Sequence, residues 1–566
     1  MNTIIKQIQT LFDKELYSNV VRICDLTLTV ADQKPESLTL ANKFQITNFY
    51  ADSLYATEQY QHAEQYYRQC IQLRKNIVKN KNGKSSDKYN DMPSEVDLKY
   101  RMHLCLLSLK KSSAALEVLQ SINAKQKDAK INMALGNLLR DSGMERLAAA
   151  AYKEVLEECP FAFEAIENLL KLGMKGTDVN SLTLEATNEI SWIGMWLKAQ
   201  AQLYSRDFAN AIETFKQMDV QGILKNNIYL LVNMGYCYHY MCEDKKAIEI
   251  LQRAHKLDTN MTYGLDLLAN LLADTEDENY SEYLENLVPK SDMQSWSSEH
   301  WIVFAFYMYN CKNFEKSAYF AHQALTVGGK NNIEALLAKA HSFFKLGKYQ
   351  EAATACADAM QICAFRFDVH KCLVDCYIKM NRLREAETMT FHACKLLNNS
   401  PHALKLHARV LLKDPVGNSK NIKKVLEKAI THDKEASTTA VILLVLFLQQ
   451  ESQFEQAKHL LLKQIENHPS SRLYQLLGDC YTNLSKNEEA FDSFNTALRL
   501  DPYNQRAIEG LNLIGPNPGN SKRDSYYTCV GDSCPSQSTL ASDHDIDALS
   551  DSDIWPNNSE MGTSFE

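Results

Sequence analysis

Apolar side chains recur along this chain at the spacing of an α-helix, with polar residues between them. Near the N-terminus, Ile4, Ile8, Leu11 and Phe12 are three or four residues apart or adjacent, so they fall on one face of such a helix. Similar stretches follow one another as far as residue 513, separated by short polar turns. The pattern predicts an all-α protein built from many helices of moderate length.

A repeated set of residue types indicates how these helices are arranged. The tetratricopeptide pattern recurs near the C-terminal end. Its first half has a large residue, Leu, Gly and Tyr, and its second half has Ala, an aromatic residue, Ala and Pro. Two further copies, one around Gly136 and one around Gly235, keep much of this order. Such a repeat is a hairpin of two antiparallel helices, A and B, and stacked hairpins form a superhelix, or solenoid, with a concave groove. The clearest copy consists of Tyr474, Leu477, Gly478, Tyr481, Ala490, Phe494, Ala497 and Pro502.

Small residues near the start of helix B show that the copies share one register. Ala148 follows Ala115 by 33 residues, and Ala386 follows Ala352 by 34. Small residues at these positions allow helices A and B to approach closely. The same position is occupied by Ala211, Ala247, Ser317, Ala457 and Ala490. The residues predicted to make the packing between helices A and B are Gly136, Ala148, Tyr152, Gly235, Tyr238, Ala247, Gly478, Tyr481, Ala490 and Phe494.

Changes in composition divide the chain into four parts. Residues 1–77 are predicted to form N-terminal hairpins, and residues 78–95 a flexible polar insertion. Residues 96–513 are predicted to form the tetratricopeptide superhelix, which ends in a capping helix. Residues 514–566 are rich in Pro, Gly, Ser, Asn and Asp, so we expect a disordered acidic tail. Ser550 and Ser552 lie among acidic residues of this tail and are candidate phosphorylation sites.

Charge and motif content argue against several classes of function. The net charge of −9 disfavours nucleic acid as a partner, and the apolar runs are too short to cross a membrane. Glycine-rich phosphate-binding motifs are absent from the sequence. His370, Cys372 and Cys376 have the residue types of a zinc site, but helical spacing favours packing in the core instead. We therefore expect no enzymatic activity, no cofactor and no metal.

The concave groove is a candidate site for binding protein segments. Tyr236, His239 and Tyr240 lie beside the Gly235 position of their helix A and form an aromatic cluster able to hold an extended peptide. The alternative, contact with a neighbouring hairpin or a stacked subunit, stays open and is the preferred interpretation.

Several sequence stretches are more specific than the general repeat. They are Leu16–Val20, Tyr50–Leu54, Pro93–Val96, Lys130–Met133 and Leu412–Pro415. In these stretches, the chain resembles the family of subunit 7 of the anaphase-promoting complex, a ubiquitin ligase of mitosis.

The resemblance implies a non-catalytic scaffold in which cullin-like and RING subunits carry the ubiquitin chemistry. It also implies other tetratricopeptide subunits as partners, and a location in the nucleus and cytoplasm. The alternative is a free tetratricopeptide adaptor that binds peptides in a chaperone or transport pathway.

The N-terminal hairpins are the predicted site of self-association. The ends of a solenoid expose apolar surface unless a polar cap covers them, and the family implies a homodimer. We expect the contact within residues 1 to about 170, with Ile4, Ile8, Leu11 and Phe12 as candidate surface residues.

Overall fold

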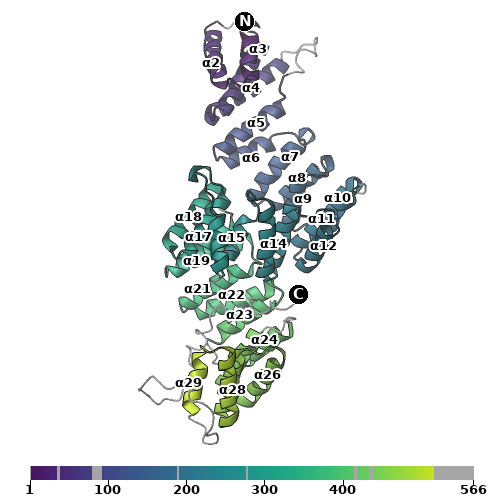
Figure 1. The fold of residues 1–566 in the computed structure, drawn as a ribbon. Coiled ribbons are helices and arrows are strands. Elements are labelled where there is room, and N and C mark those ends of the chain that lie inside the picture. The colour runs from purple at the N-terminus through teal and green to yellow at the C-terminus, as the bar shows by residue number, and fades with distance from the viewer. Residues whose placement is uncertain are drawn as a thin grey trace. The chain divides into compact units, whose positions relative to one another are not determined.

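The computed structural model describes residues 2–34, 38–79, 92–187, 190–275, 278–329, 331–413, 419–432 and 438–514. The chain divides into two compact units, Met1–Ile223 and Leu224–Glu566, and each is described by itself. In the described residues of both units, all regular structure is helical, and successive helices lie side by side (Figure 1). The prediction of an all-α fold is therefore confirmed.

The first unit holds the helices of its hairpins in chain order, with one short 3₁₀ turn at Ala124–Gln126. Its helices are α1 (Asn2–Asp13), α2 (Tyr17–Gln33), α3 (Leu40–Ala56), α4 (Tyr60–Lys79), α5 (Glu95–Ser108), α6 (Ser112–Gln120), α7 (Ala129–Asp141), α8 (Glu145–Glu158), α9 (Phe163–Lys171), α10 (Gly176–Thr187), α11 (Ser191–Tyr204) and α12 (Phe208–Val220).

The second unit continues the same alternation and has a 3₁₀ turn at Met293–Ser295. Its helices are α13 (Ile228–Tyr240), α14 (Asp244–Leu257), α15 (Leu265–Ala273), α16 (Glu278–Leu287), α17 (Ser298–Asn310), α18 (Phe314–Gly328), α19 (Ile333–Lys345), α20 (Tyr349–Ile362), α21 (Phe367–Lys379), α22 (Leu383–Leu396), α23 (Pro401–Leu411), α24 (Ser419–His432), α25 (Thr438–Gln450), α26 (Phe454–Asn467), α27 (Ser471–Asn483), α28 (Asn487–Leu500) and α29 (Gln505–Ile514).

The turns inside the hairpins follow one local rule. Two residues before helix B begins, the backbone takes a left-handed conformation, which ends helix A and reverses the chain. Gly143 and Gly347 adopt it without steric cost, with φ angles of 74° and 75°. In other described hairpins a larger residue takes the same conformation, as at Glu58, Lys110, Arg206, Cys242, Lys312, Asn381, Ser452 and Ser485. The hairpin α9–α10 differs, because its left-handed residue, Gly173, lies three residues before α10.

The small residues predicted near the start of helix B occupy equivalent places in the structure. Each is the fourth residue of its helix, and each is fully buried. At this point helix B crosses helix A of the same hairpin, where a longer side chain would force the two helices apart. These residues are Ala115, Ala148, Ala211, Ala247, Ser317, Ala352, Ala386, Ala457 and Ala490.

The boundaries predicted from composition can be compared with the helices of the structure. The predicted capping helix corresponds to α29, whose Ala507 is fully buried. The predicted insertion at 78–95 overlaps the last two residues of α4 and the first residue of α5, and residues 80–91 of it lie outside the described ranges. The same is true of residues 515–566, which include Ser550 and Ser552. Among the helices that are described, none is both long and apolar enough to cross a membrane.

Candidate binding surfaces

The predicted packing residues lie where helices A and B of one hairpin meet. A β-carbon added at Gly136 would be 2.6 Å from the ring of Tyr152, and one added at Gly478 would be 2.6 Å from the ring of Phe494. At Gly235 the facing side chain is Leu251, at 2.8 Å. The glycine on helix A is therefore required by the large side chain on helix B.

The remaining predicted packing residues surround these contacts. Ala148, Ala247 and Ala490 are fully buried, and Tyr238 is almost so. Tyr481 is partly buried and packs on the cluster that contains Ala490 and Phe494. These side chains make the hairpins, and they leave no opening for a ligand.

The structure brings the three candidate groove residues together, but it also covers them with other parts of the second unit. Tyr236 and Tyr240 stack with ring centroids 6.3 Å apart. Tyr263 lies against Tyr236, and Phe365 lies against Tyr240, with centroids 6.1 Å and 5.9 Å apart. The chain's own rings thus pack on this aromatic cluster, while Tyr236 and Tyr240 stay partly exposed, so peptide binding here stays a prediction.

His239 connects this cluster to a buried charge network. Its Nδ1 donates to Asp244 at 2.7 Å, and its Nε2 lies 3.5 Å from a carboxylate oxygen of Asp368 on α21. With a carboxylate on each side, the imidazole is held in its protonated form. His239 therefore joins α13 to α21, which is four hairpins further along the chain.

The network continues from Asp368 to two further helices. Arg366 pairs with Asp368 at 2.5 Å and also with Glu334 on α19. Asn270 on α15 donates to Glu334 at 2.8 Å. Arg366 is only 2 % exposed, so these charges are removed from water and depend on one another. These side chains join α13, α15, α19 and α21 at the inner face of this part of the unit.

The pKa values follow from this arrangement. Burial acts to lower the pKa of His239, but Asp244 and Asp368 outweigh it and raise the value to about 10. Burial acts to raise the pKa of Asp368, but Arg366 and His239 hold it well below its ordinary value. For the carboxyl of Asp266, burial and the nearby Glu334 outweigh the opposing effect of Arg366 and raise the pKa to about 7.

A smaller network of the same kind lies in the first unit. The carboxylate of Asp52 on α3 accepts from Arg101 on α5 at 2.6 Å and 2.7 Å, and from the hydroxyl of Tyr67 on α4 at 2.6 Å. Three helices from two successive hairpins thus meet at one carboxylate. Sequence analysis missed both networks, since each network includes contacts between different repeats, such as Asp52 with Arg101 and His239 with Asp368.

The candidate dimer residues of α1 mostly face their own chain. Ile8 is fully buried in the N-terminal core, so it is not available to a partner, contrary to the expectation from its helical spacing. Ile4 and Leu11 are partly buried against the same core. Phe12 packs on Tyr17 and Phe49, with ring centroids 5.6 Å and 5.1 Å away.

The apolar surface left open by the N-terminal hairpin lies on α2. Leu26 is 67 % exposed and Val30 is 48 % exposed, and they are one helical turn apart. Leu16, just before α2, is exposed as well. These three residues form the outer apolar face of this hairpin.

The residues considered as a zinc site lie in the core of the second unit. Cys372 and Cys376 are buried on α21 against α20, and Nε2 of His370 donates to the carbonyl of Ala364 at 2.7 Å. Among the described residues, no group of three or more His, Cys, Asp or Glu side chains has the arrangement of a metal site.

Comparison with known proteins extends these observations. A family model, the tetratricopeptide repeat, matches residues 46–77 and 471–504, which fall on α3–α4 and α27–α28. "Anaphase-promoting complex subunit 7" from Homo sapiens is 30% identical over 519 residues, which cover 90% of this chain and 91% of that protein. The protein of the same name from Dictyostelium discoideum is 21% identical over 529 residues, covering 90% and 89%.

The chain belongs to the anaphase-promoting complex subunit 7 family. A solved structure, the APC/C hetero-tetramer Cut9-Hcn1, has a chain of the same fold, with a TM-score of 0.56 and 14% sequence identity over 90% of this chain and 95% of that one. Together with the family model, this confirms the predicted tetratricopeptide solenoid.

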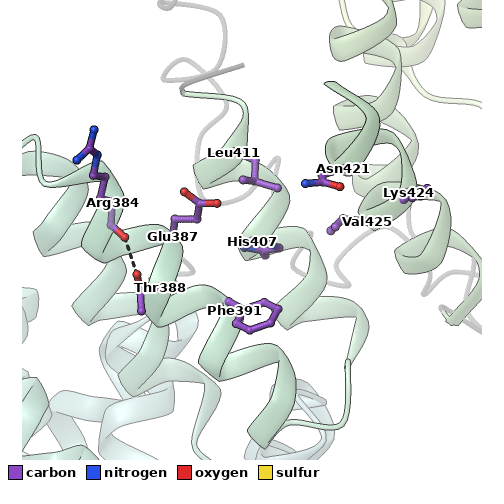
Figure 2. Close-up of a pocket in the computed structure, with 9 residues that line it drawn as sticks. All are labelled: Arg384, Glu387, Thr388, Phe391, His407, Leu411, Asn421, Lys424 and Val425. Carbon is purple, nitrogen blue, oxygen red and sulfur yellow. Dashed lines mark hydrogen bonds between the residues drawn. The ribbon is translucent and has the colours of Figure 1, made fainter. Parts of the chain in front are cut away.

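This member of the anaphase-promoting complex subunit 7 family also has a surface cavity of about 640 Å³ between the B helices α22 and α24 (Figure 2). Arg384, Glu387, Thr388 and Phe391 form its wall on α22, and Asn421, Lys424 and Val425 form the opposite wall on α24. His407 and Leu411 of α23 lie between the walls. The repeat pattern contains no signal for this cavity.

Proposed function

We propose that the chain is a non-catalytic scaffold subunit of an anaphase-promoting complex, which docks other tetratricopeptide subunits and so supports ubiquitination during the cell cycle. The observation that carries the proposal is the family membership, since the likeness to "Anaphase-promoting complex subunit 7" runs through 90% of the chain and both of its units. The relatives are named as subunits of that complex, and an extended stack of hairpins is suited to holding several partners at once.

The buried charges support a structural role. Arg366, Glu334, Asp368 and His239 are all paired with one another, so they hold helices together. A catalytic acid or base instead needs an approach for substrate. Large apolar side chains are exposed on separate helices, for example Leu26 on α2, Tyr319 on α18 and Leu500 on α28. This distribution suits a protein that contacts partners at several surfaces.

The decisive experiment is affinity purification of the tagged full chain from cells, followed by quantitative mass spectrometry. We expect cullin and RING subunits, and further tetratricopeptide subunits, in stoichiometric amounts. A free peptide-binding adaptor would instead recover chaperones or transport proteins without those subunits, and this result would overturn the proposal. We expect the tagged chain in both nucleus and cytoplasm, which imaging of the same cells tests.

We further propose that two copies of the chain associate through the N-terminal hairpins. The open apolar face of Leu16, Leu26 and Val30 supports this, because a two-fold contact between identical faces removes such surface from water. Because these side chains are already about half-buried, their further burial in a dimer is worth roughly half of the ~1.5–3 kcal/mol gained by a fully exposed apolar side chain.

Light scattering on the full chain tests the dimer. The wild-type chain should have twice the 64.5 kDa mass of one copy, and Leu26→Asp/Val30→Asp should have the mass of a single copy. Leu462→Asp/Leu500→Asp is the matched control, since these two leucines are also exposed but lie on α26 and α28. A monomeric wild-type chain at micromolar concentration contradicts the dimer and leaves the scaffold proposal in place.

A further inference from the structure

The cavity between α22 and α24 combines an apolar anchor with a basic rim. Phe391, which is 52 % exposed, extends from α22 beside the cavity (Figure 2). A half-exposed aromatic ring next to a cavity is typical of a site that holds another side chain. The ammonium group of Lys395 lies 4.4 Å from the centre of this ring and adds positive charge beside it.

The lysines of α24 form a stripe along the opposite wall. Lys420, Lys424 and Lys428 are each one helical turn apart, and all three are exposed. Within the described part of the chain, no carboxylate lies at ion-pair distance from any of them. The other side of α24, with Ile422, Leu426 and Ala429, is buried in the core, so the stripe faces solvent.

Together α22 and α24 carry six lysines and arginines and three glutamates, while the chain as a whole has a net charge of −9. A basic surface on an acidic protein attracts acidic segments over a range of about 10 Å at ordinary ionic strength. An outer solenoid face exposes lysines merely for solubility in many proteins. Here Lys424 and Arg384 line the cavity beside a single carboxylate, Glu387, and Lys420 and Lys428 continue the lysine stripe one turn to either side of Lys424. This makes the surface suited to a defined acidic partner.

An acidic segment with apolar residues is present in the chain itself. Residues 543–553 contain five aspartates and no lysine or arginine, and Ile546, Leu549, Ile554 and Trp555 lie within or directly after them. The aspartates match the lysine stripe in charge, and Trp555 is large enough to fill an apolar cavity beside Phe391.

The connection from α29 is long enough for this contact. The last described residue is Ile514, and Asp543 follows it by 29 residues, which span up to about 95 Å when extended. Only α25 to α28 separate α24 from α29 in the same unit, and neighbouring helices pack about 8–10 Å apart. Tethering also keeps the segment at an effective concentration of about 1 mM.

We propose that the acidic segment 543–555 of the C-terminal tail docks into the cavity between α22 and α24 of its own chain. The aspartates lie along Lys420, Lys424 and Lys428, and Trp555 packs against Phe391. Phosphorylation of Ser550 or Ser552 strengthens the contact by adding negative charge.

Zero-length carbodiimide cross-linking of the purified full chain tests the contact, because it joins only carboxylates and amines that touch. Mixing ¹⁵N-labelled and unlabelled protein separates links within one chain from links between copies. Links from Asp543–Asp553 to Lys420, Lys424 and Lys428 should be about tenfold more abundant than links to other lysines, and 1 M salt should remove the excess. The control lysines Lys256, Lys316 and Lys463 are also exposed in the second unit.

Two aromatic substitutions test the apolar part. Phe391→Ala and Trp555→Ala should each reduce the links to Lys424 several-fold. Tyr319→Ala, which removes a 58 % exposed ring from α18, should leave them unchanged. An even distribution of links over the six lysines, links between copies only, or equal effects of Phe391→Ala and Tyr319→Ala would each overturn the proposal.

Discussion

The hairpin α27–α28 and the inner face around α21 hold helices together by opposite means. In the hairpin, Gly478 and Ala490 let two helices approach until only apolar atoms fill the space. At the inner face, Arg366, Glu334 and Asp368 join helices of different hairpins through buried charges. The first arrangement is repeated along the chain, whereas the second occurs where particular repeats meet.

This difference has energetic consequences. A small residue in an apolar contact tolerates change to the extent that its neighbours can move. A buried charge tolerates the loss of its partner poorly, because it stays in an environment without water. The inner face should therefore be the more sensitive of the two regions to a single substitution.

The largest effect is expected from Arg366→Met. It leaves Glu334 buried without its cation and should reduce the free energy of unfolding by about 3–5 kcal/mol. Hydrogen exchange of α19 and α21 measures this locally, which matters because a stack of repeats can unfold in steps. Glu334→Met/Arg366→Met should recover part of the loss. Unchanged exchange in the single variant would show that the network contributes no stability.

Gly478→Ala measures the apolar contact for comparison. The new methyl group would meet the ring of Phe494, which cannot retreat because Gly510 lies against its other side, with an added β-carbon there only 2.5 Å away. We expect a loss of about 1–3 kcal/mol, and Ala490→Leu should act in the same direction.

Gly194→Ala is the matched control for this variant. Gly194 is also inside a helix, α11, but open space surrounds its Cα. The better helix propensity of Ala should therefore stabilise this position by up to about 1 kcal/mol. Equal effects of the two glycine substitutions on thermal unfolding would contradict the packing of Gly478 on Phe494.

The dependence of stability on pH distinguishes the two regions without a change in packing. The pKa of His239 is about 10 in the folded chain and 6.5 in the ordinary state, so its contribution is complete below pH 6.5 and is lost as the pH rises to about 10. Asp368, with a lowered pKa, contributes above its ordinary value of 3.8 and loses this contribution in stronger acid. Thermal unfolding between pH 6.5 and 10 should therefore show a steeper loss in the wild-type chain than in His239→Gln. Parallel curves would mean that the histidine is not held between two carboxylates.

The packing within the hairpin α27–α28 could be predicted from the sequence. The position of Ala490 could be predicted because the same small residue returns at intervals near 34 residues, and a residue's neighbours within a hairpin are close in sequence. The left-handed turn residues, such as Lys110 and Ser485, also lie at a fixed place, two residues before helix B. Their residue types alone do not predict a left-handed conformation.

The inner face could not be predicted in this way. His239 and Asp368 are 129 residues apart, and their contact depends on how the three intervening hairpins curve. Tyr236 and Tyr240 could be named as a cluster, but the rings that cover them come from Tyr263 and Phe365. Ile8 illustrates a third difficulty: helical spacing shows that a residue is on an apolar face, but it does not show whether that face meets the chain itself or a partner.

Deletion of residues 516–566 should have the smallest effect on both regions. The contacts that the described residues show for Gly478 and Arg366 are with Phe494 of α28, Glu334 of α19 and Asp368 of α21. The acidic composition of residues 516–566 provides few apolar side chains to bury. A tail held in the cavity by charge adds only the modest energy of exposed ion pairs and one aromatic contact, about 1 kcal/mol or less in the presence of salt. The melting temperature should then shift by less than about 4 °C, and recovery of the other complex subunits in affinity purification should be unchanged. A large loss of stability would instead mean that residues beyond α29 take part in the apolar packing around Phe494. Those residues would then belong to the hairpin region α27–α28 and not to the inner face around α21.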